Sequence, residues 1–179
     1  MFLIEGTYAS YKLSKESAQK LSDWIERCEI IDPVPMEDLH VTTTYSKADV
    51  DIVPSNKHII IKKEDLTVDK LGRALVLRFI SDDLQKIHDD AMDVGASYEY
   101  ETYKPHITIS YNAEANDNLY PLLLNGTLDK DYKIDFDITL SHEEVEPLKE
   151  EPANSTANIP VVPIPMKTFK MFRRKITEK

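Results

Sequence analysis

The sequence has 179 residues but only one cysteine, four glycines and no long apolar run. A single cysteine, Cys28, excludes an internal disulfide and favours a reducing compartment. A membrane-spanning helix needs about 18 or more consecutive apolar residues, and none occur. Met1 to Glu5 lack the basic flank and long apolar core of a signal peptide. We therefore expect a cytoplasmic protein with no membrane partner.

The net charge is acidic, at −10 for the whole chain. Binding to a nucleic-acid duplex depends on neutralising many phosphates, so this charge argues against a duplex as partner. It is compatible with a small anionic ligand held at one site. Basic residues gather at the C-terminus, where residues 167–179 hold six of them against Glu178 alone. That tail is either a solvated terminus or a segment that folds back on the acidic body or recruits an anion.

Hydrophobic periodicity predicts an α+β fold made of two similar halves. Each half contains a helix and a histidine-bearing strand, so we expect a bilobal, duplicated architecture with antiparallel sheets flanking a central cleft and helices outside. Residues 1–148 form this domain, and residues 149–179 form an extended Pro-rich arm with the basic tail. One expected helix begins at Ser14, and two others cover 81–94 and 119–124. Besides the two histidine strands, the expected strands cover 2–13, 57–62, 73–80 and 132–140.

Two short stretches of the chain are nearly identical in pattern. Residues 39–44 read Leu-His-Val-Thr-Thr-Thr, and residues 105–110 read Pro-His-Ile-Thr-Ile-Ser. Each places a histidine two residues before a threonine within a run of β-branched residues. Alternate residues of a strand point to the same face, so His40 shares a face with Thr42, and His106 shares one with Thr108.

Two imidazoles, each with a neighbouring hydroxyl, can cleave a phosphodiester without a metal. An imidazole titrates near neutral pH, so one can take a proton as general base while the other gives one as general acid. Threonine hydroxyls can donate hydrogen bonds to phosphoryl oxygens as charge builds. His40, Thr42, His106 and Thr108 are therefore the candidate catalytic residues. The remaining histidines (His58, His88 and His142) have no such motif, and we expect them to be structural or surface residues.

Other chemistries have weaker support. Zinc-binding helices often carry His-x-x-x-His, which is absent, and Cys28 stands alone on an apolar helix face. No Gly-rich phosphate loop occurs, and no serine lies in a recognisable nucleophile elbow. The sequence thus predicts no cofactor and no metal.

The paired His-x-Thr motifs resemble those of the 2H phosphoesterase superfamily, and the resemblance covers the chain from Phe2 to about Leu148. Within it, the sequence is most similar to the phage anti-CBASS family, which degrades cyclic oligonucleotide signals of a bacterial defence system. The opening Phe-Leu-Ile-Glu-Gly-Thr-Tyr and the segment Glu-Val-Glu-Pro-Leu at 144–148 add to the similarity. The resemblance implies that Tyr8 contacts a nucleobase by stacking and that Glu146 contacts the substrate.

The favoured function is a metal-independent phosphodiesterase that hydrolyses cyclic di- or trinucleotides with 3′–5′ linkages, such as cGAMP, in the host bacterial cytoplasm if phage-encoded. One alternative is a 2′,3′-cyclic phosphodiesterase acting on RNA ends, although its polyanionic substrate would favour a basic groove. Another is a non-catalytic module that sequesters a nucleotide. The sequence decides neither the oligomeric state nor which histidine is acid and which is base.

Overall fold

The computed structural model describes residues 6–124 and 132–148. The expected arm and basic tail at 149–179 lie outside these ranges, as do the first four residues (2–5) of the predicted opening strand. Within them, seven strands form one antiparallel sheet in the order β3-β7-β1-β2-β6-β5-β4. The elements are β1 (Gly6–Leu13), α1 (Lys15–Arg27), η1 (Met36–Asp38), β2 (His40–Ser46), β3 (Ile59–Ile61), η2 (Lys63–Asp65), β4 (Thr67–Leu71), β5 (Ala74–Arg78), α2 (Asp82–Asp93), β6 (His106–Ser110), η3 (Glu114–Asn116), α3 (Tyr120–Leu124) and β7 (Ile138–Leu148).

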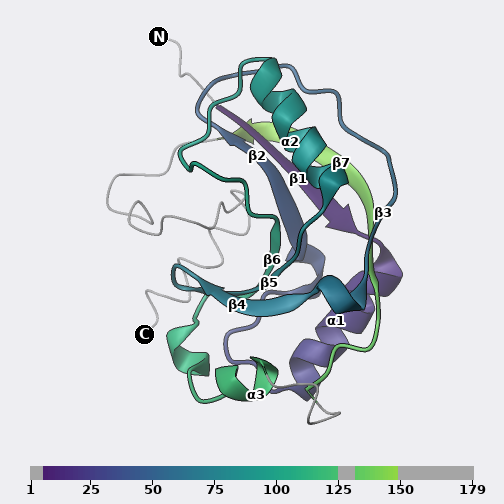
Figure 1. Cartoon of the computed structure of the whole chain (residues 1–179), viewed down its shortest axis with the longest axis vertical. Helices are drawn as coiled ribbons and strands as arrows, with labels where there is room; N and C mark the ends of the chain where they lie inside the picture. Colours follow the sequence, from purple (N-terminus) through teal and green to yellow (C-terminus); the bar gives the residue numbers. More distant parts are fainter. Residues whose placement is uncertain (1–5, 125–131, 149–179) are drawn as a thin grey trace.

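The expected α+β class and the duplication are both visible in this order. In the first half α1 connects the neighbouring strands β1 and β2, and in the second half α2 connects the neighbouring strands β5 and β6. The two expected sheets are joined, because β2 and β6 pair at the centre and make them one. The sheet is strongly twisted, so the strands of the two halves run in different directions (Figure 1).

Each long helix begins where its sequence predicts. Ser14 caps α1 by accepting a hydrogen bond from the Ser17 amide, and Ser81 caps α2 by accepting one from Leu84. Gly95 follows α2 with a φ of 105°, a conformation that suits glycine. Helical spacing then turns one apolar face of each helix to the sheet, and the buried members of these faces are Leu21, Trp24, Ile25, Leu84 and Ala91.

Both helices pack against the same face of the sheet. Tyr11 and Val41 point to this face and belong to a hydrophobic cluster that also contains Trp24 and Leu84. We call this the core face. Alternation along the strands sends the neighbouring residues, including His40 and Thr42, to the opposite face, which we call the motif face. One side of the sheet therefore stabilises the fold, while the other carries the candidate chemistry.

Two strand predictions differ from the structure. The last strand was expected at 132–140 from its alternation, but β7 covers Ile138–Leu148, because the acidic stretch after Leu140 pairs along β1, with Glu144 and Glu146 exposed and Glu143 buried. The hairpin strand β4 (Thr67–Leu71) was not predicted, since its five residues carry little apolar pattern. It turns into β5 through Gly72, whose φ is 61°.

Candidate functional site

The two motifs are 66 residues apart in sequence and lie on adjacent strands in the structure. Val41 of β2 is paired with Ile107 of β6 in antiparallel register, and both side chains are buried in the core face. The residues on either side of each therefore point to the motif face. In this register His40 lies across from Thr108, and His106 lies across from Thr42. The structure thus brings together all four residues predicted as catalytic, in a nearly two-fold arrangement.

Each histidine strand carries a β-bulge immediately after its motif. Between β1 and β2 the register passes from Ser10↔Thr42 to Ala9↔Thr44, which leaves Thr43 as the extra residue. Between β5 and β6 the register passes from Val76↔Thr108 to Leu75↔Ser110, which leaves Ile109 as the extra residue. Bulges bend a strand and re-aim neighbouring side chains. Both copies share this local geometry, which supports a common role for the two motifs.

The two imidazole rings are held in the same way. Nδ1 of His40 lies 2.6 Å from the backbone oxygen of Asp38, and Nδ1 of His106 lies 2.8 Å from that of Lys104. A carbonyl oxygen can only accept, so Nδ1 is the donor in both rings. The proton that is gained and lost in each ring is then the one on Nε2.

Tyr8 contacts the first motif through its hydroxyl. The Tyr8 oxygen lies 2.9 Å from His40 Nε2 and 2.9 Å from Thr42 Oγ1, so it bridges the two motif side chains. Burial raises the pKa of Tyr8 well above 10, and the hydrogen bond with Thr42 opposes this only in part. The phenol is therefore neutral at all physiological pH values.

The burial of Tyr8 disfavours the stacking role expected from the resemblance. Stacking needs an accessible ring face, but only 1% of the Tyr8 surface is exposed. Tyr8 does point to the motif face, whereas Tyr11 points to the core face, where its hydroxyl contacts Ser55 and the Lys57 carbonyl. Only Tyr8 of these two tyrosines therefore faces the motifs, and it contacts them through its oxygen and not through its ring.

The second histidine lies in a different electrostatic environment. Burial lowers the pKa of His106 below its ordinary value of 6.5; the hydrogen bond to Lys104 opposes the shift, and the Arg78 guanidinium adds to it. Arg78 of β5 lies directly across from His106, and its guanidinium forms an ion pair with Asp69 at 2.6 Å. His106 is thus favoured as a neutral base at pH 7.

Each histidine has a basic residue across the strand from it. Lys12 is paired with His40, just as Arg78 is paired with His106, and paired residues share a face. Sequence analysis did not find either cation, because each is a single basic residue in a strand remote from the motifs. The register of the sheet is the only signal that places them beside the histidines.

A buried cluster supports the first motif from the core face. Nδ1 of His88 lies 2.8 Å from the Thr43 carbonyl oxygen, and the Tyr103 hydroxyl donates to the Thr42 carbonyl oxygen at 2.7 Å. The His88 and Tyr103 rings are stacked with their centroids 4.3 Å apart. His88 therefore has a structural role, as its lack of a motif predicts.

Glu146 lies on β7 directly across from Tyr8, which places it on the motif face. It is exposed, and its charge contributes to the raised pKa of Tyr8. Glu143, on the core face, is buried and binds Thr43 at 2.5 Å and the Ser55 amide at 3.1 Å. Glu144, paired with Ser10, is exposed on the same face, so Glu144 and Glu146 are the two acids of this stretch that a ligand on the motif face could reach.

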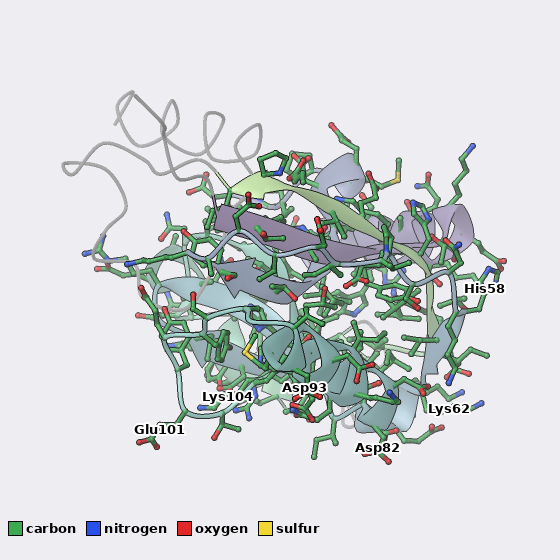
Figure 2. The ribbon with its side chains drawn as sticks, turned by 90° about the horizontal axis from the view of Figure 1, so that it is seen from above. His58, Lys62, Asp82, Asp93, Glu101 and Lys104 are labelled. Carbon is green, nitrogen blue, oxygen red and sulfur yellow. The ribbon has the colours of Figure 1, made fainter. Side chains whose placement is uncertain are left out.

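The other two histidines are exposed. His58 lies at the edge of the molecule (Figure 2). His142 is exposed and lies 3.5 Å from Glu144. Among residues 6–124 and 132–148, no three His, Cys, Asp or Glu side chains are grouped so that they could hold a metal ion. In the same ranges no helix is long and apolar enough to span a bilayer.

Comparison with known proteins identifies relatives of this chain. The family described as "Anti-CBASS protein Acb1" matches residues 5–155. The Acb1 of Enterobacteria phage T4 is 32% identical over 147 residues, covering 80% of this chain and 89% of that protein. The Acb1 of Escherichia phage RB16 is 32% identical over 118 residues, covering 63% and 66%. A crystal structure of E. coli LigT with 3′-AMP overlaps with a TM-score of 0.48 at 14% identity, covering 81% of this chain and 95% of that one.

Proposed function

The chain belongs to the family of the anti-CBASS protein Acb1, and we propose that the four motif residues on β2 and β6 are its catalytic centre. It is an anti-CBASS phosphodiesterase, as the resemblance to the 2H phosphoesterases implied. The observation that carries the catalytic assignment is the pairing of Val41 with Ile107, which sets both His-x-Thr motifs on one face of adjacent strands. As an anti-CBASS protein it acts in the cytoplasm of the host bacterium.

The proposed substrate is a cyclic di- or trinucleotide with 3′–5′ linkages. Such a ligand carries only two or three phosphates, so an acidic chain can bind it with few cations. Lys12 and Arg78, each paired with one histidine, supply positive charge on both sides of the motifs. Phosphate oxygens between them would accept hydrogen bonds from Thr42 and Thr108.

We take His106 as the general base, because burial and Arg78 lower its pKa and so favour its neutral form. Its neutral Nε2 takes the proton from the nucleophile, which is the adjacent ribose 2′-hydroxyl or a water molecule. The nucleophile oxygen then forms a bond to phosphorus, and the bond from phosphorus to the 5′ oxygen breaks. His40, in its protonated form, gives its Nε2 proton to that 5′ oxygen. The two histidines end the step with their protonation states exchanged.

The Tyr8 hydroxyl links the acid to the phosphate-binding hydroxyl. Tyr8 has one proton to donate, so its two hydrogen bonds to His40 and Thr42 must run in one direction. When His40 is protonated, Nε2–H donates to Tyr8, Tyr8 donates to Thr42, and the Thr42 hydroxyl proton is available for a phosphoryl oxygen. When His40 is neutral, the chain reverses and Thr42 donates to Tyr8. While His40 is protonated, the Thr42 hydroxyl can therefore bind a phosphoryl oxygen, and the single Nε2–H leaves Tyr8 when it passes to the 5′ oxygen.

Turnover by the purified protein tests this proposal. We expect linear products from a panel of cyclic dinucleotides in the presence of excess EDTA. His40→Ala and His106→Ala should each lower turnover by at least about 100-fold while substrate binding changes much less. Loss of activity on chelation with recovery on adding zinc would contradict a metal-free site. Cleavage of RNA 2′,3′-cyclic ends but of no cyclic dinucleotide would establish the alternative substrate class, and tight binding without turnover would establish sequestration.

The product also identifies the nucleophile. Attack by water adds the mass of one water molecule to the linear product. Attack by the 2′-hydroxyl gives a linear product of unchanged mass that ends in a 2′,3′-cyclic phosphate. Mass spectrometry of the first product separates these two reactions without any variant.

A further inference from the structure

Asp38 is the last residue of η1 and stands two residues before His40. Only 5% of its surface is exposed. Its backbone is fully used: the amide donates to the Pro35 carbonyl, and the carbonyl accepts from His40 Nδ1. Its carboxylate is different. Oδ2 is buried, and no residue that the structure describes donates a hydrogen bond to it.

The carboxylate lies on the motif side of the sheet. Leu39 belongs to the core cluster and has an extended backbone, so Asp38 and His40 point to the opposite face. The loop before η1 runs beside β6, where Val34 donates to the Ile109 carbonyl at 2.9 Å. Asp38 is also close enough to Tyr111 for its charge to raise the pKa of that phenol. These contacts place the carboxylate beside the end of β6 that carries Thr108.

A buried carboxylate oxygen without a donor is uncommon in native proteins and calls for a specific explanation. The phosphates of the substrate cannot supply the missing donor, because they are anionic and have only acceptor oxygens. The neutral donors of a nucleotide are the ribose hydroxyls and the amino and imino groups of the bases. Any of these could donate to Oδ2 while the phosphate contacts the neighbouring motif residues.

We propose that Asp38 is a specificity-determining residue that accepts a hydrogen bond from an N–H or O–H donor of the nucleoside beside the scissile phosphate. This inference rests on the proposed function, since it takes the bound ligand to be a nucleotide. It gives the short helix η1 two tasks, because the backbone of Asp38 orients the His40 ring while its side chain reads the nucleoside.

The test compares Asp38→Asn with Glu37→Gln. Glu37 is the preceding residue of the same short helix and is exposed, so its substitution removes one negative charge without touching the motif face. We expect Asp38→Asn to raise KM about tenfold for the preferred substrate and to change the order of preference among guanine-, adenine- and uracil-containing cyclic dinucleotides. Glu37→Gln should keep both the KM and the order of preference.

A second measurement separates base from ribose recognition. Affinities for the 2′-hydroxyl and 2′-fluoro forms of one cyclic dinucleotide are measured in a His106→Ala background, with and without Asp38→Asn. If the ribose hydroxyl is the donor, Asp38→Asn abolishes the discrimination between the two forms. If a base is the donor, the discrimination stays and the order of base preference changes.

A purely structural role gives a different result. If Asp38 served only to hold His40, Asp38→Asn would lower kcat equally for every base and leave the KM ratios and the ribose discrimination unchanged, which would overturn the inference. Asp38→Ser, which cannot reach as far, provides a second variant should Asp38→Asn fold poorly, with the same readouts. Failure of the wild-type protein to turn over any cyclic dinucleotide would instead refute the proposed function itself.

Discussion

Removal of the Tyr8 hydroxyl is the sharpest test of how the first motif operates. Tyr8→Phe keeps the ring and its packing but removes the oxygen that bridges His40 and Thr42. A role in base stacking would tolerate this change, because the ring face survives. The structure predicts the reverse, since the ring is buried and the hydroxyl makes the contacts. Activity should fall even though an aromatic ring is retained.

The magnitude follows from the two hydrogen bonds that are lost. Removing one partner of a buried hydrogen bond costs about 1–3 kcal/mol when the other partner is left unsatisfied. If this cost is realised in the transition state, kcat falls by about 5- to 150-fold. KM should change little, because the Tyr8 hydroxyl is bonded to His40 and Thr42 and makes none of the proposed substrate contacts. The assay is steady-state cleavage of the preferred cyclic dinucleotide across a range of pH, with thermal unfolding measured in parallel.

Tyr11→Phe is the matched control. Tyr11 lies on the same strand and is also buried with its hydroxyl bonded, but it faces the core. Its substitution should lower the unfolding temperature without lowering kcat. A Tyr8→Phe variant with wild-type kcat and an unchanged pH profile would refute the hydrogen-bonded chain from His40 to Thr42.

Three further outcomes are expected. Arg78→Gln should shift the acid limb of the pH–rate profile to higher pH than the wild-type limb, which should lie below pH 6.5, because Arg78 helps to lower the pKa of His106. An acid limb that is unchanged in the variant would show that Arg78 does not act on the base. Thr42→Val and Thr108→Val should each lower kcat by the equivalent of about 1–3 kcal/mol while the fold is kept, and full activity would reduce the hydroxyls to strand-forming groups. A chain that ends after residue 148 should keep at least part of the hydrolysis rate, and a folded but inactive truncation would place the boundary of the catalytic unit later.

The elements that sequence analysis predicted well are those determined by local chemistry. Helix α1 follows from the Ser14 cap and the 3.6-residue spacing of its apolar face, and the two histidine strands follow from their β-branched runs. The less predictable elements depend on partners remote in sequence. β7 is a strand beyond Leu140 because β1 offers a hydrogen-bonding edge, and no property of Glu143 or Glu144 alone indicates this.

The same division applies to the site. A repeated His-x-Thr pattern is local and readable, so the sequence alone was enough to propose the four motif residues. The contacts of Tyr8 were not predicted, because a strand tyrosine has the same pattern whether it presents its ring or its hydroxyl. The bulges after Thr42 and Thr108 escaped notice for a related reason: a bulge is a mismatch between two strands, and one strand alone does not contain it.

The near-copy relation of the motifs raises the question of how they can do opposite tasks. A general acid and a general base must differ in protonation at the same pH, yet both rings donate Nδ1–H to a carbonyl two residues earlier. The hydrogen bonds that hold the two rings within their own strands are therefore equivalent. The difference must therefore come from the neighbouring strands, β1 beside β2 and β5 beside β6.

The register shows where the two halves diverge. Lys12 and Ser10 face the first motif from β1, and Arg78 and Val76 face the second from β5. Two residues before Ser10 on β1 is Tyr8, and two residues before Val76 on β5 is Ala74. The methyl group of alanine offers no hydrogen bond, so β5 has no equivalent of the hydroxyl that bridges His40 and Thr42. Both histidines face a cation across the strand, Lys12 or Arg78, so the difference between them lies in the neutral phenol, whose oxygen can accept a hydrogen bond from Nε2–H of charged His40. In the proposed mechanism, this one tyrosine-to-alanine difference in a duplicated fold, combined with burial around His106, would divide acid from base between two otherwise equivalent histidines.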